Sequence, residues 1–177
     1  MEENKTSVGV IALGYGAMLG VALIIFSLLL YVLDLQQNRF LGYLSFVIIL
    51  AGVWLVQLNY RKKYMGGYMI YSKAFMVGFL TIIFASILAG IYTFIFFKYI
   101  DPNAMAEAKQ IAEQSMIKQG MTDQQIDRSM AIMEKFQTPG WFTAWGVLAN
   151  IIIGTILVLI TSIFTKKEDL NAGMPAQ

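Results

Sequence analysis

The sequence predicts an all-α integral membrane protein, a four-helix bundle with an extramembrane helical hairpin between its third and fourth spans. Of its 177 residues, 58% are hydrophobic and only 14% are charged, and the mean hydropathy is +0.63. Soluble domains carry about 25% charged residues. Four long stretches contain no charged residue, and a polar stretch at 99–140 separates the last two. A water-soluble core is therefore excluded, because a chain of this size cannot hide so much apolar surface from water.

The four uncharged stretches are expected to be membrane spans at about residues 8–33, 41–58, 74–97 and 141–165. Backbone polar groups in hydrocarbon must be satisfied within the chain, so we expect each of these single spans to be helical. The first helix would exceed the ~30 Å hydrocarbon core, so it must tilt or protrude. We expect one membrane domain over residues 1–177, with a disordered tail at 171–177.

The positive charges predict the orientation of the spans. The loop between spans two and three and the C-terminal flank carry cations without an intervening acid: Arg61, Lys62, Lys63, Lys73, Lys166 and Lys167. Residues 98–140 instead mix five cations with six acids. Because cytoplasmic loops are enriched in Lys and Arg, both termini are expected in the cytoplasm and residues 99–140 on the opposite side.

The polar insert at 101–138 is expected to form an antiparallel helical hairpin. Asp101 is a good helix N-cap with a proline directly after it, and Gly120 is a natural helix end. Thr122 and Gln125 have the spacing of a capping box that starts a second helix. Both helices carry an apolar stripe, which is either the seam of the hairpin or a surface for a partner. The candidate interface residues are Met105, Met116, Ile126, Met130, Met133 and Phe136.

Reactive side chains are scarce. The chain has no cysteine and no histidine, and no charged residue lies inside a span. This argues against His- or Cys-based catalysis, proton-coupled pumping and metal chemistry. An enzyme at the membrane surface would have only Asp34, Asp101 and Glu107 as outer acids near the membrane boundary. We therefore expect no enzymatic activity, no cofactor and no metal, and no nucleic-acid partner.

Small residues at four-residue spacing predict close helix packing. Asn150 is the most polar group deep in a span, and either a contact within the bundle or ligand coordination fits it. The candidate packing residues are Gly16, Gly20, Ala85, Ser86, Ala89, Gly90, Gly146, Asn150 and Gly154. The basic group Arg61, Lys62, Lys63 with Lys73 is either a topology anchor or a site for anionic lipid head groups.

The sequence around residues 60–78 resembles the DUF4199 family of small four-span membrane proteins, found mainly in Bacteroidetes. The likeness is carried by Tyr60-Arg61, Gly67, Tyr71-Ser72-Lys73-Ala74-Phe75, Gly78, Tyr99-Ile100-Asp101-Pro102, and Leu159-Ile160 before Lys166-Lys167. The resemblance implies a bacterial inner-membrane protein with residues 99–140 in the periplasm, and it implies no catalytic residue. It also implies that the gene lies near the gene of a membrane-associated glycosyltransferase. This enzyme is therefore an expected partner, and a role in envelope glycan or lipid assembly is expected.

The leading functional hypothesis is a non-enzymatic membrane scaffold or accessory subunit that holds another membrane protein through the outer hairpin. Membrane lipids and a further copy of the chain are the other expected partners. The alternative is a small oligomeric transporter or lipid-handling protein with a polar path near Asn150, Thr93 and Ser86.

Overall fold

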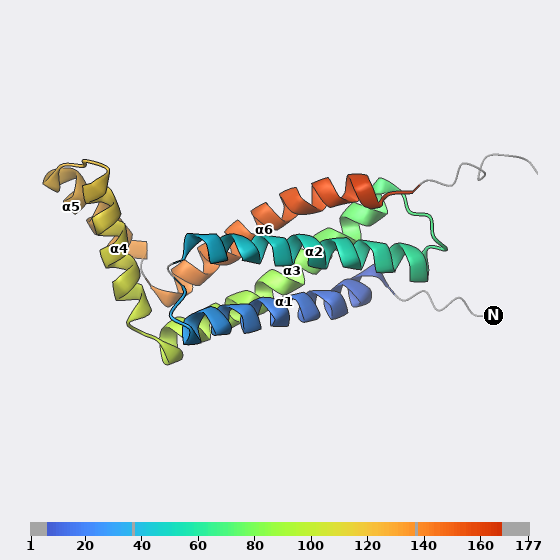
Figure 1. Ribbon diagram of the computed structural model, residues 1–177, viewed down its shortest axis with the longest axis horizontal. Coiled ribbons are helices and arrows are strands. Elements are labelled where there is room, and N and C mark those ends of the chain that lie inside the picture. Colours follow the sequence, from blue (N-terminus) through green and yellow to red (C-terminus); the bar gives the residue numbers. More distant parts are fainter. Residues whose placement is uncertain (1–6, 37, 137, 168–177) are drawn as a thin grey trace, which may run out of the picture. The chain divides into compact units, whose positions relative to one another are not determined.

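The computed structural model of the protein describes residues 7–36, 38–136 and 138–167 (Figure 1). These residues form six α-helices and one π-helical turn, and the predicted all-α fold is confirmed. The expected tail at 171–177 lies outside the described residues. The elements in chain order are α1 (Val8–Val32), α2 (Arg39–Tyr64), α3 (Tyr71–Ile95), the π-helix η1 (Phe96–Ile100), α4 (Ala104–Lys118), α5 (Asp123–Phe136) and α6 (Pro139–Thr165).

Four helical segments of the described chain are long and apolar enough to cross a membrane. They are Val8–Val32, Phe40–Tyr64, Tyr71–Ile100 and Pro139–Thr165, and the most apolar windows have mean hydropathies of 2.1 to 2.5. At 1.5 Å per residue, helices of 25 residues or more exceed the ~30 Å thickness of the hydrocarbon core. The chain is therefore a multi-pass membrane protein, as its composition predicted.

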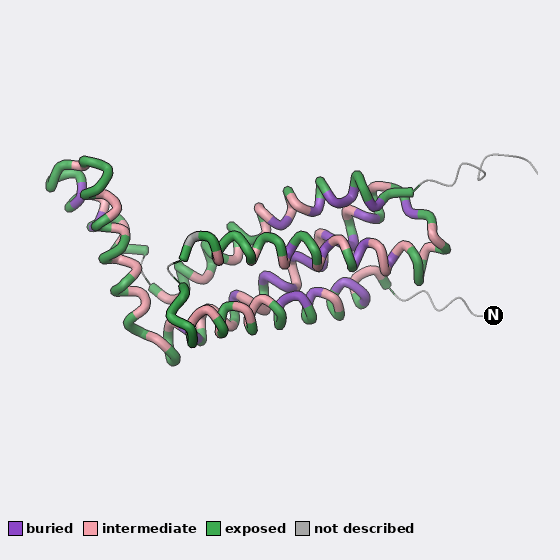
Figure 2. The backbone as a smooth tube through the Cα atoms, in the orientation of Figure 1, coloured by how far each residue is buried: buried purple, intermediate pink, exposed green. Residues whose placement is uncertain are grey.

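The chain divides into two compact units, residues 1–89 with 149–177 and residues 90–148. In the first unit, buried positions lie where α1, α2, α3 and α6 face one another, and the outer sides are exposed (Figure 2). Two apolar clusters form its core. One contains Ile11, Val56, Tyr60, Met69, Ala74 and Val77, and the other contains Leu19, Ile49, Val53, Ile82, Ala85 and Val158.

Close contact between α1 and α3 depends on two glycines, Gly16 and Gly20. A Cβ at Gly16 would lie 2.7 Å from the Cβ of Phe84 and 2.9 Å from the carbonyl oxygen of Thr81. A Cβ at Gly20 would lie 2.9 Å from the side chain of Leu88. The structure thus places the glycine pair of α1 directly against α3, the arrangement by which small residues let membrane helices approach closely.

The helices α2 and α3 extend beyond the limits of their apolar runs. The second span was expected at 41–58, yet α2 continues through the basic residues to Tyr64. Hydropathy marks where a helix leaves hydrocarbon, whereas a helix ends at a breaker, here Gly66 and Gly67 with φ of +59° and +93°. Likewise, α3 begins at Tyr71 instead of 74 and continues as η1 to Ile100.

Asp34 closes the first span in the left-handed conformation, with φ of 55°. Its backbone N–H donates to the carbonyl of Tyr31 at 3.1 Å, and that of Leu35 donates to Leu30 at 2.9 Å. These two bonds satisfy carbonyls at the end of α1 in the manner of a Schellman motif. The structure therefore places Asp34 at the helix end, outside the apolar run.

The hairpin follows its predicted signals with one correction at its start. The first helix begins at Ala104, because Pro102 and Asn103 form a turn; Asp101 still caps it, accepting from the N–H groups of Asn103 and Ala104 at 3.1 and 3.0 Å. Gly120 has φ of +76° and ends α4. The N–H of Thr122 donates to Gln125 Oε1 at 3.0 Å, which is one half of the predicted capping box.

The glycine contact between α1 and α3 yields a matched pair of substitutions. We expect Gly16→Ala to lower the free energy of unfolding by about 1–3 kcal/mol, because the added methyl group meets a Cβ and a backbone oxygen. Gly14→Ala is the control, since a Cβ there meets no atom within 4 Å. Reversible unfolding of both variants in mixed micelles measures the difference. A Gly16→Ala protein as stable as Gly14→Ala would contradict the packing.

Candidate functional site

A buried polar cluster lies among the apolar side chains of the first unit, centred on Gln57 of α2. Its side-chain Nε2 donates to the carbonyl of Ala74 at 3.2 Å and to Ser162 Oγ at 3.0 Å. Its Oε1 accepts from Thr165 Oγ1 at 3.1 Å. Gln57, Ser162 and Thr165 are fully buried, so one amide connects α2, α3 and α6 by hydrogen bonds.

The cluster continues toward the basic end of α2. Arg61 Nη1 donates to the carbonyl oxygen of Thr165 at 2.8 Å, which satisfies a carbonyl at the end of α6. Beyond it, Met69 and Lys167 exchange two backbone hydrogen bonds of 2.7 and 2.8 Å. Of the predicted basic group, Arg61 is therefore partly structural, while Lys62, Lys63 and Lys73 are exposed. These side chains are free to meet the head-group region.

The predicted packing row on α6 needs a correction. Gly154 is buried, and a Cβ there would lie 2.5 Å from Ile82. Gly146 and Asn150 are exposed, however, and a Cβ at Gly146 would meet no atom within 4 Å. A step of four residues overshoots a helical turn by about 40°, so a strict four-residue row winds around the helix. The buried seam alternates steps of four and three instead, at Gly154, Val158, Thr161 and Thr165.

The small residues of α3 serve two neighbours. Ala85 is buried, and its backbone lies against Gly16 and Gly20 of α1. In the second unit, a Cβ at Gly90 would lie 2.4 Å from the side chain of Val147 on α6. Ser86 is buried and Ala89 is half-buried. The structure therefore places these four predicted packing residues of α3 at buried or half-buried positions.

The apolar stripe of the hairpin is largely its own seam. Ile126 and Met130 of α5 are buried, and Met116 of α4 is half-buried. An ion pair between Lys109 and Glu134 joins the two helices at the surface. The Lys109 ammonium, hydrogen-bonded to Glu134 and attracting its charge, lowers the pKa of that exposed carboxyl group. For Met116, Ile126 and Met130, the structure therefore favours the interpretation of the stripe as the seam between the two hairpin helices.

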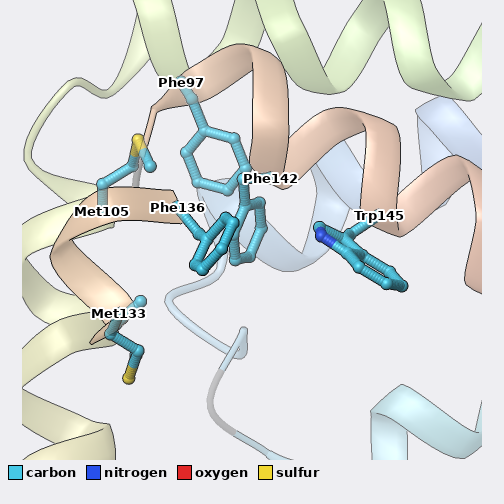
Figure 3. Close-up of a pocket in the computed structure, with 7 residues that line it drawn as sticks. Phe97, Met105, Met133, Phe136, Phe142 and Trp145 are labelled. Carbon is cyan, nitrogen blue, oxygen red and sulfur yellow. The ribbon is translucent and has the colours of Figure 1, made fainter. Parts of the chain in front are cut away.

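The remaining stripe residues line an apolar hollow in the second unit (Figure 3). Its volume is about 210 Å³, and it lies between the start of α4, the end of α5, the π-helix and the start of α6. It is lined by Phe97, Met105, Ala108, Met133, Phe136, Phe142 and Trp145. Met105, Met133 and Phe136, three of the six predicted interface residues, are therefore brought together here.

Aromatic ring contacts build the walls of this hollow. Phe97 and Phe142 meet edge to face, with their ring centroids 5.0 Å apart, and Phe136 meets Trp141 in the same way at 5.7 Å. Trp141 and Trp145 are 50% and 59% exposed, so the aromatic surface continues outside the hollow. Such a site can bind an apolar group, since its lining side chains offer rings, methyl groups and thioethers and no charge.

Within the described ranges, no three Asp or Glu side chains gather in a way that could hold a metal ion. The Asp101 carboxylate accepts backbone hydrogen bonds, and Glu134 is paired with Lys109.

A protein-family model covers most of the chain. The family described as a protein of unknown function, DUF4199, matches residues 14–167, most of the chain. The chain belongs to the DUF4199 family. Neither a curated protein nor a solved structure matches it. In this DUF4199 protein the match extends from α1 to the end of α6 and so includes both the Gln57 cluster and the apolar hollow.

Two features of the site were missed from the sequence. Gln57 stands inside an otherwise apolar run, and this signal was available in the sequence. The prediction instead singled out Asn150 as the most polar group deep in a span, and Asn150 is exposed. Phe97, Phe142 and Trp145 of the hollow were not among the predicted site residues. Aromatic residues are common at membrane boundaries in general, so the sequence gives no distinct sign that these three side chains lie around one hollow.

The Gln57 cluster is tested by removing its amide. We expect Gln57→Leu to lower the free energy of unfolding by about 1–3 kcal/mol, because three hydrogen bonds between helices are lost in a place without water. Asn59→Leu is the control, since Asn59 lies on the same helix, is half-buried and makes no hydrogen bond through its side chain to the described residues. Equal effects of the two substitutions on unfolding would refute a special role for Gln57.

Proposed function

We propose that this protein is a non-enzymatic accessory subunit of the bacterial inner membrane, which holds a partner membrane protein through the apolar hollow at the base of its hairpin. The observation that carries the proposal is the hollow itself. It is an open, uncharged site walled by aromatic and methionine side chains, three of which come from the hairpin. Aromatic and methionine residues are the types enriched at protein interfaces.

The size of the hollow favours a side chain of a partner over a separate small molecule. Pockets for drug-sized ligands measure about 300–1,000 Å³, whereas this hollow measures about 210 Å³. Binding energy at protein interfaces concentrates in a few apolar anchors that fill pockets of the other protein. The exposed rings of Trp141 and Trp145 would extend such a contact beyond the hollow.

Charge supports an orientation with both termini in the cytoplasm and residues 99–140 in the periplasm. The end of α2 and the start of α3 carry Arg61, Lys62, Lys63 and Lys73 without an acid between them, and Lys166 and Lys167 follow α6. Cytoplasmic loops are enriched in such residues. In this orientation the hollow opens at the outer surface, where an envelope enzyme for glycan or lipid assembly, such as a membrane glycosyltransferase, is a fitting partner.

The orientation is tested with single cysteines, for which the chain is suited because it has none of its own. We expect Gln124→Cys on the hairpin to react with an impermeant maleimide in intact spheroplasts. Ser72→Cys beside the basic loop should react only after the membrane is opened. Both positions are exposed in the structure. The reverse labelling pattern would invert the topology and place the hollow on the cytoplasmic side.

The docking role is tested with neighbouring substitutions on α5. In crosslinked native membranes, we expect one stoichiometric partner protein, and Met133→Asp should reduce its recovery about fivefold or more, because a carboxylate then occupies the apolar site. Ile132→Asp should leave recovery unchanged, since Ile132 is 56% exposed and outside the lining of the hollow.

The same experiment distinguishes the accessory subunit from the second candidate, a lipid-handling protein. That candidate is also compatible with the hollow, because an uncharged lining can contact a lipid chain. A photoreactive residue in place of Phe136 would then crosslink to phospholipid and to no protein. That result, or equal recovery of the partner with both aspartate variants, would remove the accessory-subunit proposal.

A further inference from the structure

The basic ends of α2 and α6 meet at one end of the first unit (Figure 1). Arg61 Nη1 donates to the carbonyl oxygen of Thr165 at 2.8 Å, and the N–H of Gly67 donates to the carbonyl oxygen of Arg61 at 2.9 Å. Two further backbone hydrogen bonds, of 2.7 and 2.8 Å, join Met69 to Lys167. These residues form one framework, the basic corner, which holds the cations Arg61 and Lys167 on neighbouring segments.

Both cations of the basic corner keep donors that no described residue accepts from. The guanidinium of Arg61 has five N–H donors, yet it bonds to the described residues only through Nη1, and its Nε is buried without an acceptor. Lys167 is exposed, and its Nζ lies 5.4 Å from the centre of the Tyr68 ring. The ring attracts the ammonium charge but leaves its three N–H donors available to an oxygen acceptor.

The charge of the basic corner is not neutralised within the described part of the chain. The sequence contains no Asp or Glu from residue 35 to 100 or from 135 to 167. The ion pair that the described residues form lies on the hairpin, away from these segments of the sequence. Glu168 and Asp169, which follow Lys167 directly, lie outside the described residues. The fold therefore presents two positioned cations to an anion.

The surface next to the basic corner is apolar and exposed. Ile163 and Phe164 directly precede Thr165 at the end of α6, and they are 56% and 66% exposed. The Phe164 ring lies 6.1 Å from the ring of Trp54 on α2. At the end of a membrane span such side chains contact lipid chains, whereas basic residues lie at the depth of the head groups. An occupant that fits both surfaces has an anionic group attached to an apolar chain.

We infer that the basic corner binds the phosphate group of an anionic phospholipid, with Arg61 and Lys167 donating to its oxygens and an acyl chain lying along Ile163 and Phe164. The forked donors of arginine match phosphate oxygens, and basic sites between membrane helices bind anionic head groups. A free anion has no chain for the apolar surface, and a zwitterionic lipid carries a cation of its own. The site includes no residue of the hollow, so it does not depend on the proposed function.

The first arm of the test measures lipid preference with the full chain in phosphatidylcholine vesicles. Spin-labelled phosphatidylglycerol and phosphatidylcholine report the relative association of each lipid with the protein. We expect the parent to prefer phosphatidylglycerol about tenfold, and Lys167→Gln to lower that preference about fivefold. Lys63→Gln is the matched control, because it removes the same charge from the same helix end. Lys63 is exposed and lies about 200° around α2 from Arg61, so the preference should stay unchanged.

The second arm tests the recognition of phosphate on a lipid. Arg61→Lys keeps the charge but loses the forked donors, and it should lower the preference about threefold. Excess inorganic phosphate should leave the preference of the parent at its value in sodium chloride of equal ionic strength, because the free anion lacks the acyl chain.

Three results would overturn the inference. A parent protein without preference for phosphatidylglycerol would mean that the chain's own acids, such as Glu168 and Asp169, neutralise the basic corner. Equal losses for Lys167→Gln and Lys63→Gln would mean a diffuse surface charge in place of a site. Displacement of phosphatidylglycerol by inorganic phosphate would assign the basic corner to a free anion. None of these results bears on the recovery of a partner protein through the hollow.

Discussion

The constraint on which this structure depends is that hydrocarbon satisfies no hydrogen bond. A polar group that α1, α2, α3 or α6 carries into the membrane is therefore favourable only where it finds a partner within protein. The Gln57 cluster shows how the chain meets this demand, with one amide bonded to Ala74, Ser162 and Thr165 on two other helices. Apolar packing brings the helices together without specifying their register. The amide specifies it, because a helix shifted by one residue would leave these groups unpaired.

The same constraint separates the two polar amides of the spans. Gln57 is fully buried and fully bonded, whereas Asn150 is exposed. Burial thus identifies Gln57, and not Asn150, as the amide that connects helices of the first unit. The hairpin helices α4 and α5 differ from the four long apolar helices, because they carry charged residues and pair Lys109 with Glu134 at their surface.

Local signals made most of the fold predictable. The absence of charge over four stretches predicted the spans, and α1 and α6 begin and end within about two residues of the expected limits. Capping residues predicted both hairpin helices, since Asp101, Gly120 and Gln125 act within one turn of their own backbone. The predicted end of α2 was wrong because hydropathy indicates where a helix leaves hydrocarbon, whereas the helix itself ends at the glycines with positive φ, Gly66 and Gly67. The candidate site was less predictable: Met105, Met133 and Phe136 were identified, but the wall formed by Phe97, Phe142 and Trp145 was not.

The sequence by itself determined the solvent of the protein, the number of its spans and the places where its helices are capped, because each depends on residues close together in the chain. Only the tertiary structure decided which side of each helix is covered. Gly154 and Asn150 are four residues apart on α6, yet Gly154 packs on Ile82 and Asn150 is exposed. That difference depends on which neighbouring helices lie beside each turn of α6, and those neighbours are residues far apart in sequence.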